Sequence, residues 1–174
     1  MPETDRDDLK KWAEELFDKG HGDLVGGRTV IAVGHGLYRY GRTVHKSVDC
    51  PKIMKAGKEI ARRAGIQTNF THALIAATPA HRDGGIGTHM DRECVPGSPL
   101  LAVGLDGRRK VLFDFPGHGT TQVEGDYLAL SGLHTRVEHR VVTTSYTLGI
   151  IWRVQKPANS RSLNGVLTPR SCPK

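Results

Sequence analysis

The 174-residue chain is long enough to bury the core of one domain, and its 37% share of hydrophobic residues is that of a globular protein, which excludes a disordered chain. No run of about 18 apolar residues occurs, so we expect no transmembrane helix and no membrane partner. The net charge of +7 favours a polyanionic partner, of which nucleic acid is the commonest.

The N-terminal residues and the cysteines bear on the cellular compartment. Residues 1–11 are polar and partly acidic, so they do not resemble a secretory signal, and we expect a cytoplasmic or nuclear monomer. The three cysteines, Cys50, Cys94 and Cys172, are widely spaced and form no Cys-x-x-Cys pair. This spacing argues against a disulfide framework and against a structural zinc site, and it predicts reduced thiols.

Two segments in the first part of the chain have helical patterns. Apolar residues at helical spacing predict an amphipathic helix over residues 5–19, which Gly20 is suited to end. Pro51 opens a second helical segment, because proline is favoured in the first turn of a helix, and Gly65 ends it. We interpret the first helix as a packing helix with no chemistry of its own.

The rest of the chain is predicted to be mostly β. Residues 29–33 form a short apolar strand, and residues 37–45 favour a second strand or a hairpin. Asp106-Gly107, between two apolar runs, is a strong hairpin signal. The further candidate strands cover residues 70–77, 87–91, 99–105, 110–115, 126–131 and 143–153.

Many short strands after a few helices predict the fold class. We expect an α+β chain that is mainly β, with N-terminal helices and a double-stranded β-helix, or jelly roll. Residues 1–27 are expected to form an N-terminal helix and linker, and residues 28–154 the jelly-roll domain. Residues 155–174 are polar and rich in proline, which predicts a flexible basic tail.

The segment Gly87-Thr88-His89-Met90-Asp91 carries a metal-binding pattern. Residues two apart in a strand point to the same face, so His89 and Asp91 can present an imidazole and a carboxylate side by side. One more histidine would complete the two-histidine, one-carboxylate set that is typical of non-haem iron(II) oxygenases. His21 and Asp23 have the same spacing, but His21 lies between glycines after a helix, so we favour His89 and Asp91.

The third ligand is expected some tens of residues later, on a strand that returns to the same end of the fold. The available histidines are His118, His134 and His139. His118 is flanked by glycines, which suits a turn. His134 and His139 both follow residues 125–132, and the residues alone leave the choice between them open.

An ordered series of motifs over residues 28–153 resembles the AlkB family of iron(II)- and 2-oxoglutarate-dependent dioxygenases, including the compact form found in replication polyproteins of RNA viruses. Residues 85–93 are similar to the family's first metal motif, with Glu93 as its trailing acid. In this register His139 is the third metal ligand, and His134 is the alternative. The other matching segments are Tyr38-x-Tyr40-x-Arg42, Asn69-Phe70, Ala73-Leu74-Ile75, Ser98-Pro99-Leu100-Leu101, residues 105–109, Leu112-Phe113, Gly125-Asp126 and Ser131-Gly132.

The resemblance implies bound iron(II) and 2-oxoglutarate, but the co-substrate positions depart from the family pattern. The last strand of the family usually carries two arginines six residues apart. Arg153 matches the second arginine, whereas Thr147 stands at the first position. An upstream strand usually offers an asparagine and a tyrosine, and here those positions are Ala76 and Thr78.

A desolvated dicarboxylate needs cationic or hydrogen-bonding partners. We therefore expect Arg153 to form a charge-assisted pair with the co-substrate, and Tyr146 and Thr147 to supply hydroxyl groups. Arg140 follows the predicted ligand His139 directly, so a regular strand places it on the opposite face.

The activity that the resemblance implies is oxidative demethylation of N-alkylated bases in RNA or single-stranded DNA, with release of formaldehyde. Tyr38 and Tyr40 are expected either to stack on a base or to be half-buried strand aromatics. Arg42 and Glu93 are expected on the substrate side of the site. The residues expected to contact phosphates are Arg42, Lys46, Arg82, Arg108, Arg109 and Lys110.

Two other functions stay open at this stage. The altered co-substrate positions fit a nucleic-acid-binding module that keeps the fold and has lost catalysis. An oxygenase that hydroxylates a protein or a small molecule is the third hypothesis. The sequence does not identify the modified base or choose between RNA and DNA.

Overall fold

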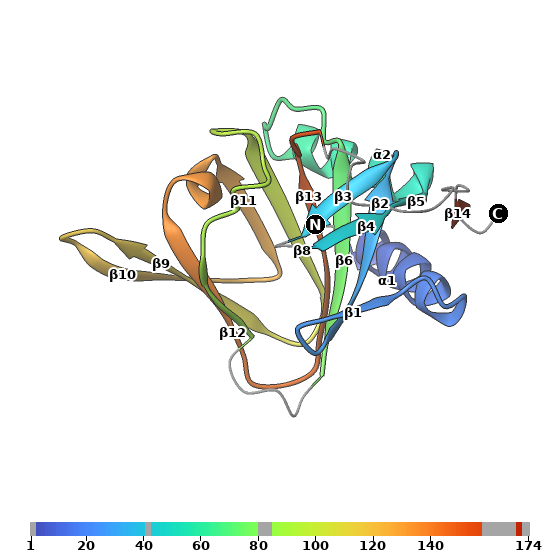
Figure 1. The fold of residues 1–174 in the computed structure, drawn as a ribbon, viewed down its shortest axis with the longest axis horizontal. Coiled ribbons are helices and arrows are strands. Elements are labelled where there is room, and N and C mark those ends of the chain that lie inside the picture. The colour runs from blue at the N-terminus through green and yellow to red at the C-terminus, as the bar shows by residue number, and fades with distance from the viewer. Residues whose placement is uncertain (1–2, 41–42, 80–84, 158–169, 172–174) are drawn as a thin grey trace.

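The computed structural model describes residues 3–40, 43–79, 85–157 and 170–171. A large sheet and a smaller one lie against each other as a jelly roll, and two helices cover the outer side of the large sheet (Figure 1). The predicted fold class, mainly β with N-terminal helices, is confirmed. The predicted division of the chain at residues 27 and 154 stays a prediction.

Helices α1 (Glu3–Asp18) and α2 (Pro51–Arg63) are the two that the sequence predicts. Each is amphipathic, and the buried residues Leu9 and Ile53 represent the apolar faces that pack onto the sheet. Trp152 of the sheet donates its indole Nε1–H to the carbonyl of Ile53 at 3.1 Å. This bond fixes α2 against the outer face of the large sheet.

The large sheet is mostly antiparallel and has the strand order β11-β8-β13-β6-β2-β5-β14, with β1 paired to β2. The short strand β14 falls within the predicted tail and pairs in parallel with β5. The strands of this sheet are β1 (Asp23–Val25), β2 (Arg28–Gly34), β5 (Val48–Asp49), β6 (His72–Thr78), β8 (Pro99–Asp106), β11 (Tyr127–Ser131), β13 (Thr147–Arg153) and β14 (Arg170–Ser171).

The smaller sheet has the strand order β10-β9-β12-β7. A separate hairpin, β3 with β4, confirms the hairpin expected over residues 37–45. The remaining elements are β3 (Leu37–Tyr40), β4 (Thr43–Lys46), β7 (Ile86–His89), β9 (Arg109–Phe115), β10 (Gly119–Glu124), β12 (Glu138–Thr143) and the 3-10 turn η1 (Leu133–Thr135).

Successive side chains of β13 alternate between the hydrophobic core under the helices and the space between the two sheets. Leu148, Ile150 and Trp152 are buried in the main hydrophobic cluster beneath the helices. Thr147 and Arg153 lie on the other face and line a cavity between the two sheets. The interior of the jelly roll therefore carries polar side chains as well as apolar ones.

The hairpin expected at Asp106-Gly107 is wrong. Strand β8 pairs with β11 and β13, whereas β9 pairs with β10 and β12, so the turn carries the chain from one sheet to the other. Gly107 has φ +65°, and a Cβ there would collide with the carbonyl oxygen of Tyr146. The dipeptide marks a tight turn, but the turn type does not determine which strands pair.

The cysteine and membrane expectations have different outcomes. Cys50 is disulfide-bonded, so the expectation of reduced thiols is wrong for this residue, whereas Cys94 is free and buried. Among the described residues, no helix combines the length and the apolar character that crossing a membrane requires.

Candidate metal centre and the cavity behind it

Three side chains from the predicted motif and from β12 converge at one end of the jelly roll. His89 ends β7 and is the direct cross-strand partner of His139 in β12. Asp91 follows β7, and its Oδ1 lies 3.4 Å from His89 Nε2. One potential ligand atom from each of His89, Asp91 and His139 lies within 4.8 Å of the others. These side chains have the spacing of a single-ion site.

Backbone carbonyls fix the orientation of both imidazole rings. His89 donates its Nδ1–H to the carbonyl of Gly87 at 2.8 Å, and His139 donates its Nδ1–H to the carbonyl of Val137 at 3.2 Å. A carbonyl can only accept, so these contacts assign the proton to Nδ1 and leave the lone pair on Nε2 in each neutral ring. Metal-ligating histidines are commonly oriented in this way.

The electrostatics suit a divalent cation. Burial by itself would raise the pKa of Asp91, but the nearby charge of Arg153, with a smaller contribution from His89, outweighs it and holds that pKa well below its usual value. Burial lowers the pKa of His139, which favours its neutral form, whereas the contacts of His89 with Asp91 and Gly87 outweigh burial and raise the pKa of His89. Asp91 Oδ2 is buried without a hydrogen-bond partner. An ionised carboxylate with an unpartnered oxygen beside two oriented imidazoles fits iron(II) or a similar ion.

The alternative ligand His134 belongs to a different group. It lies in η1, is fully buried, and has no partner for either ring nitrogen. With Asp91 and Cys94 it forms a second cluster, which does not include His89. Burial lowers the pKa of His134 to about 4 and raises that of Cys94 to about 12. Of the two histidines, His139 is the one that meets both residues of the motif.

Arg153 lies directly behind the metal cluster. Its side chain is buried, and its Nη1 donates to Glu93 Oε1 at 3.1 Å and lies 3.6 Å from Asp91 Oδ1. The buried arginine is therefore neutralised by a predicted metal ligand and by the trailing acid of the motif. Glu93 thus contacts Arg153, and the substrate-side role expected for it stays a prediction.

The cavity between the sheets extends along β13 from Arg153 to Thr147. At the far end it is lined by Arg28 of β2 and Arg109 of β9. Thr78 and Thr143 lie at the same end, because they pair in register with Thr147 and Arg109. The cavity thus has Arg153, which contacts the predicted metal ligand Asp91, at one end, and two further arginines at the other.

The remaining predicted residues are dispersed. Thr147 lines the cavity, whereas Tyr146 is 44% exposed and is not among the residues that line it, so the co-substrate role of Tyr146 stays a prediction. Arg140 is exposed on the outer face of β12, as predicted. Lys46 lies in β4 and Lys110 in β9. Arg42 and Arg82 fall outside the described residues.

The two tyrosines expected to contact substrate differ in environment. Tyr38 is fully buried, and its ring meets that of His72 edge-on at 5.6 Å between centroids. Tyr40 is partly buried beneath the guanidinium of Arg28, 5.4 Å from its ring centroid. In this structure Tyr38 therefore has no free face for a base, and base stacking stays a prediction for Tyr40.

Arg28 was not predicted as a site residue, and Arg109 was predicted to contact phosphates, although both line the cavity. The signal for Arg109 was present, because it shares a strand face with Val111 and Phe113, and Phe113 is buried against the ring of His139. No comparable signal existed for Arg28, which stands at the first position of an apolar strand.

The comparisons with known proteins show the fold. A prolyl-4-hydroxylase from Pseudomonas putida has a TM-score of 0.57 and 14% identity, with 90% of this chain and 89% of that chain covered. A 2OG-Fe(II) oxygenase family oxidoreductase from Burkholderia pseudomallei has a TM-score of 0.54 and 12% identity, with 83% and 88% covered. A prolyl hydroxylase from Trichoplax adhaerens, solved with a peptide fragment of hypoxia inducible factor, has a TM-score of 0.58 and 12% identity, with 89% and 80% covered.

No protein-family model matches the sequence, and no curated protein matches it either. At identities this low the likeness is one of fold. The chain therefore has the jelly-roll fold found in iron(II)- and 2-oxoglutarate-dependent oxygenases.

Proposed function

We propose that this protein is an iron(II)- and 2-oxoglutarate-dependent oxygenase. The observation that carries the proposal is the convergence of His89, Asp91 and His139 at one end of the jelly roll, with both imidazoles oriented by backbone carbonyls. These three side chains would hold iron(II). Bound iron(II) with 2-oxoglutarate would supply the oxidising power, by activating dioxygen for attack on a C–H bond of the substrate.

The protein's own residues would hold and orient the ligands. Asp91 supplies a negative charge to the metal site, and the nearby guanidinium of Arg153 keeps that carboxylate ionised. Apolar residues of the cavity wall, including Leu74 and Ile151, would exclude water around the 2-oxo acid. Thr147 and Arg153 are the predicted co-substrate residues that remain in contact with this cavity.

For the substrate we propose an N-alkylated base in RNA or single-stranded DNA. Hydroxylation of an N-methyl group gives a hemiaminal, which loses formaldehyde and leaves the unmodified base. The support is the ordered series of AlkB-like motifs together with the net charge of +7, which favours a polyanionic ligand. Exposed cations such as Arg108 would contact the phosphates.

Hydroxylation of a protein is the second candidate. It is favoured by the two prolyl hydroxylases among the structural neighbours, each of which covers at least 89% of this chain. The burial of Tyr38 also removes one of the two aromatics expected to stack on a base. A module without catalysis is the third candidate, and it is motivated by Ala76, Thr78 and Thr147 at co-substrate positions.

Turnover of 2-oxoglutarate to succinate by the iron-loaded full chain tests these candidates. Each reaction would contain either an oligonucleotide with N-methylated bases or a proline-containing peptide, and His89→Ala would serve as the inactive control. Substrate-dependent succinate with formaldehyde supports demethylation, and succinate with a peptide heavier by one oxygen supports hydroxylation. Metal binding without any succinate above the His89→Ala level would overturn the oxygenase proposal.

A further inference from the structure

We infer that Arg109 and Arg28 together form the anchor for the distal carboxylate of 2-oxoglutarate, an inference that rests on the proposed function. The anchor would replace the arginine that the family carries where this chain has Thr147. Arg28 is 8% exposed, and its Nε is buried without a hydrogen-bond partner. Arg109 has a buried Nη2 that is likewise unpartnered. Both side chains line the far end of the cavity behind the metal cluster.

A guanidinium group that is removed from water without an anion is unfavourable, and the buried Arg28 and the partly buried Arg109 also repel each other. No carboxylate among the described residues forms an ion pair with Arg28 or Arg109, in contrast to Arg153, which has Asp91 and Glu93. Burial and the nearby charge of Arg28 accordingly lower the pKa of Arg109. Cations that face a cavity without a carboxylate partner are the arrangement expected of an anion site.

The position of Arg109 fits the length of the co-substrate. Its Nη2 lies against the backbone of Gly149, so close that a Cβ at Gly149 would collide with it. Gly149 is four residues before Arg153 on β13, which corresponds to about 13 Å along the strand. The side chains of Arg109 and Arg153 occupy part of this distance. A five-carbon dicarboxylate would span the rest of the distance between the metal and the far end of the cavity.

Further groups at the same end can donate to a carboxylate. Thr143 is the cross-strand partner of Arg109, and its Oγ1 is buried without a hydrogen-bond partner. The cavity is narrow, about 30 Å³, so 2-oxoglutarate would enter by displacing the flexible ends of the arginine side chains. Such movement would bring the guanidinium groups into contact with the ligand while the backbone of the strands stays in place.

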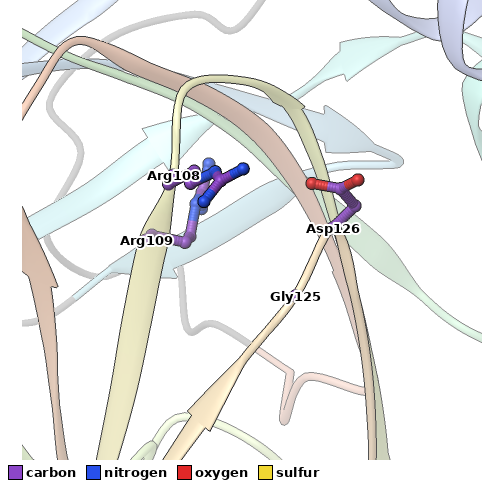
Figure 2. A pocket seen from close by; sticks show the side chains of 4 residues that line it. All are labelled: Arg108, Arg109, Gly125 and Asp126. Carbon is purple, nitrogen blue, oxygen red and sulfur yellow. The ribbon is translucent and has the colours of Figure 1, made fainter.

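Arg108 provides a matched control because it precedes Arg109 and has a different environment. Figure 2 shows Arg108 and Asp126 on opposite sides of a pocket that Arg109 also borders. Arg108 is exposed and does not line the cavity between the sheets. Its removal changes the net charge by the same amount as the removal of Arg109.

The test is calorimetric titration of the manganese(II)-loaded full chain with 2-oxoglutarate and with pyruvate, a 2-oxo acid that lacks the distal carboxylate. We expect Arg109→Met and Arg28→Met each to weaken 2-oxoglutarate binding about 10- to 100-fold, the range of charged hydrogen bonds. Pyruvate affinity should stay the same in both variants, and Arg108→Met should bind 2-oxoglutarate like the wild type. Unchanged 2-oxoglutarate affinity in both cavity variants would overturn the anchor.

Two further measurements keep the outcomes distinct. Because an unpaired buried cation is removed, the melting temperature of ligand-free Arg109→Met should not fall. A lower melting temperature, with 2-oxoglutarate and pyruvate affinities reduced equally, would assign Arg109 a structural role and overturn the anchor. Arg109→Met combined with Thr147→Arg should recover 2-oxoglutarate affinity. A metal-loaded wild type that binds neither 2-oxo acid would overturn the proposed function itself, and this anchor with it.

Discussion

His89 and His139 are direct cross-strand neighbours in the β7–β12 ladder, with their ring centroids 4.4 Å apart. This pairing brings residues 50 positions apart in the sequence into one cluster with Asp91. A slip of one residue in the ladder would turn His139 to the outer face, where Arg140 now lies. The register of two short strands therefore decides whether the cluster exists.

Metal binding is the first prediction. His89→Ala and Asp91→Ala should each abolish stoichiometric binding of manganese(II), because each variant loses one of the three donors in the cluster. Metal content after gel filtration measures this. His21→Ala is the matched control, because His21 and Asp23 repeat the same spacing and should not matter. Full metal retention by both cluster variants would disprove the assignment.

The choice between His139 and His134 is the second prediction. His139→Ala should reduce metal affinity far more than His134→Ala, because His134 groups with Asp91 and Cys94 and not with His89. Titration with manganese(II) gives the two affinities, and circular dichroism confirms that both variants fold. A larger loss in His134→Ala would place the ion in the Asp91, Cys94 and His134 cluster instead.

The third prediction concerns the packing of α2. Gly57 faces Trp152 so closely that a Cβ would collide with the indole ring, which is held by its bond to Ile53. Gly57→Ala should lower the free energy of unfolding by roughly 1–3 kcal/mol through overpacking, although alanine is the better helix former by about 1 kcal/mol. Urea unfolding checks the sign. An increase in stability would show that Trp152 moves freely.

The sequence predicts individual elements better than their relationships. Both helices and the metal motif could be predicted, because hydrophobic period and residue type are local properties. Strand β12, which carries His139, was not among the candidate strands, because the sequence of residues 138–143 does not alternate between apolar and polar residues. At Gly107 the chain passes from the large sheet to the smaller one, and the side chain of Arg109 lines the cavity. Both features depend on which strands pair, and no local pattern determines that.

The fourth prediction separates the neighbouring arginines in nucleic-acid binding. If single-stranded RNA or DNA binds, the slope of log affinity against log salt should fall by about 1 in Arg108→Ala, because one phosphate contact is lost. Arg109→Ala should leave the slope unchanged, since its guanidinium faces the cavity. Fluorescence anisotropy at several salt concentrations measures both. Equal slopes in the two variants and the wild type would exclude Arg108 as a phosphate contact.

The last prediction concerns Arg153, which contacts Glu93 and Asp91 while also lining the cavity. Arg153→Ala would leave two buried carboxylates without their cation, at a cost of roughly 3–5 kcal/mol of stability in the ligand-free protein. Since the charge of Arg153 is a main reason that the pKa of Asp91 is low, metal affinity should fall as well. Urea unfolding and manganese(II) titration measure these two effects.

Arg153→Lys distinguishes charge from geometry. Lysine restores a positive charge and should recover part of the stability, but it cannot reproduce the planar fork of a guanidinium toward two carboxylates and a co-substrate. In Arg153→Ala the affinity for 2-oxoglutarate should fall about a hundredfold or more, with pyruvate affected to a similar degree, because Arg153 lies at the metal end of the cavity. This pattern is the opposite of the one expected for Arg109→Met, which affects 2-oxoglutarate alone. If both Arg153 variants bound metal and 2-oxoglutarate like the wild type, Arg153 would be a structural residue with no part in holding the ligands.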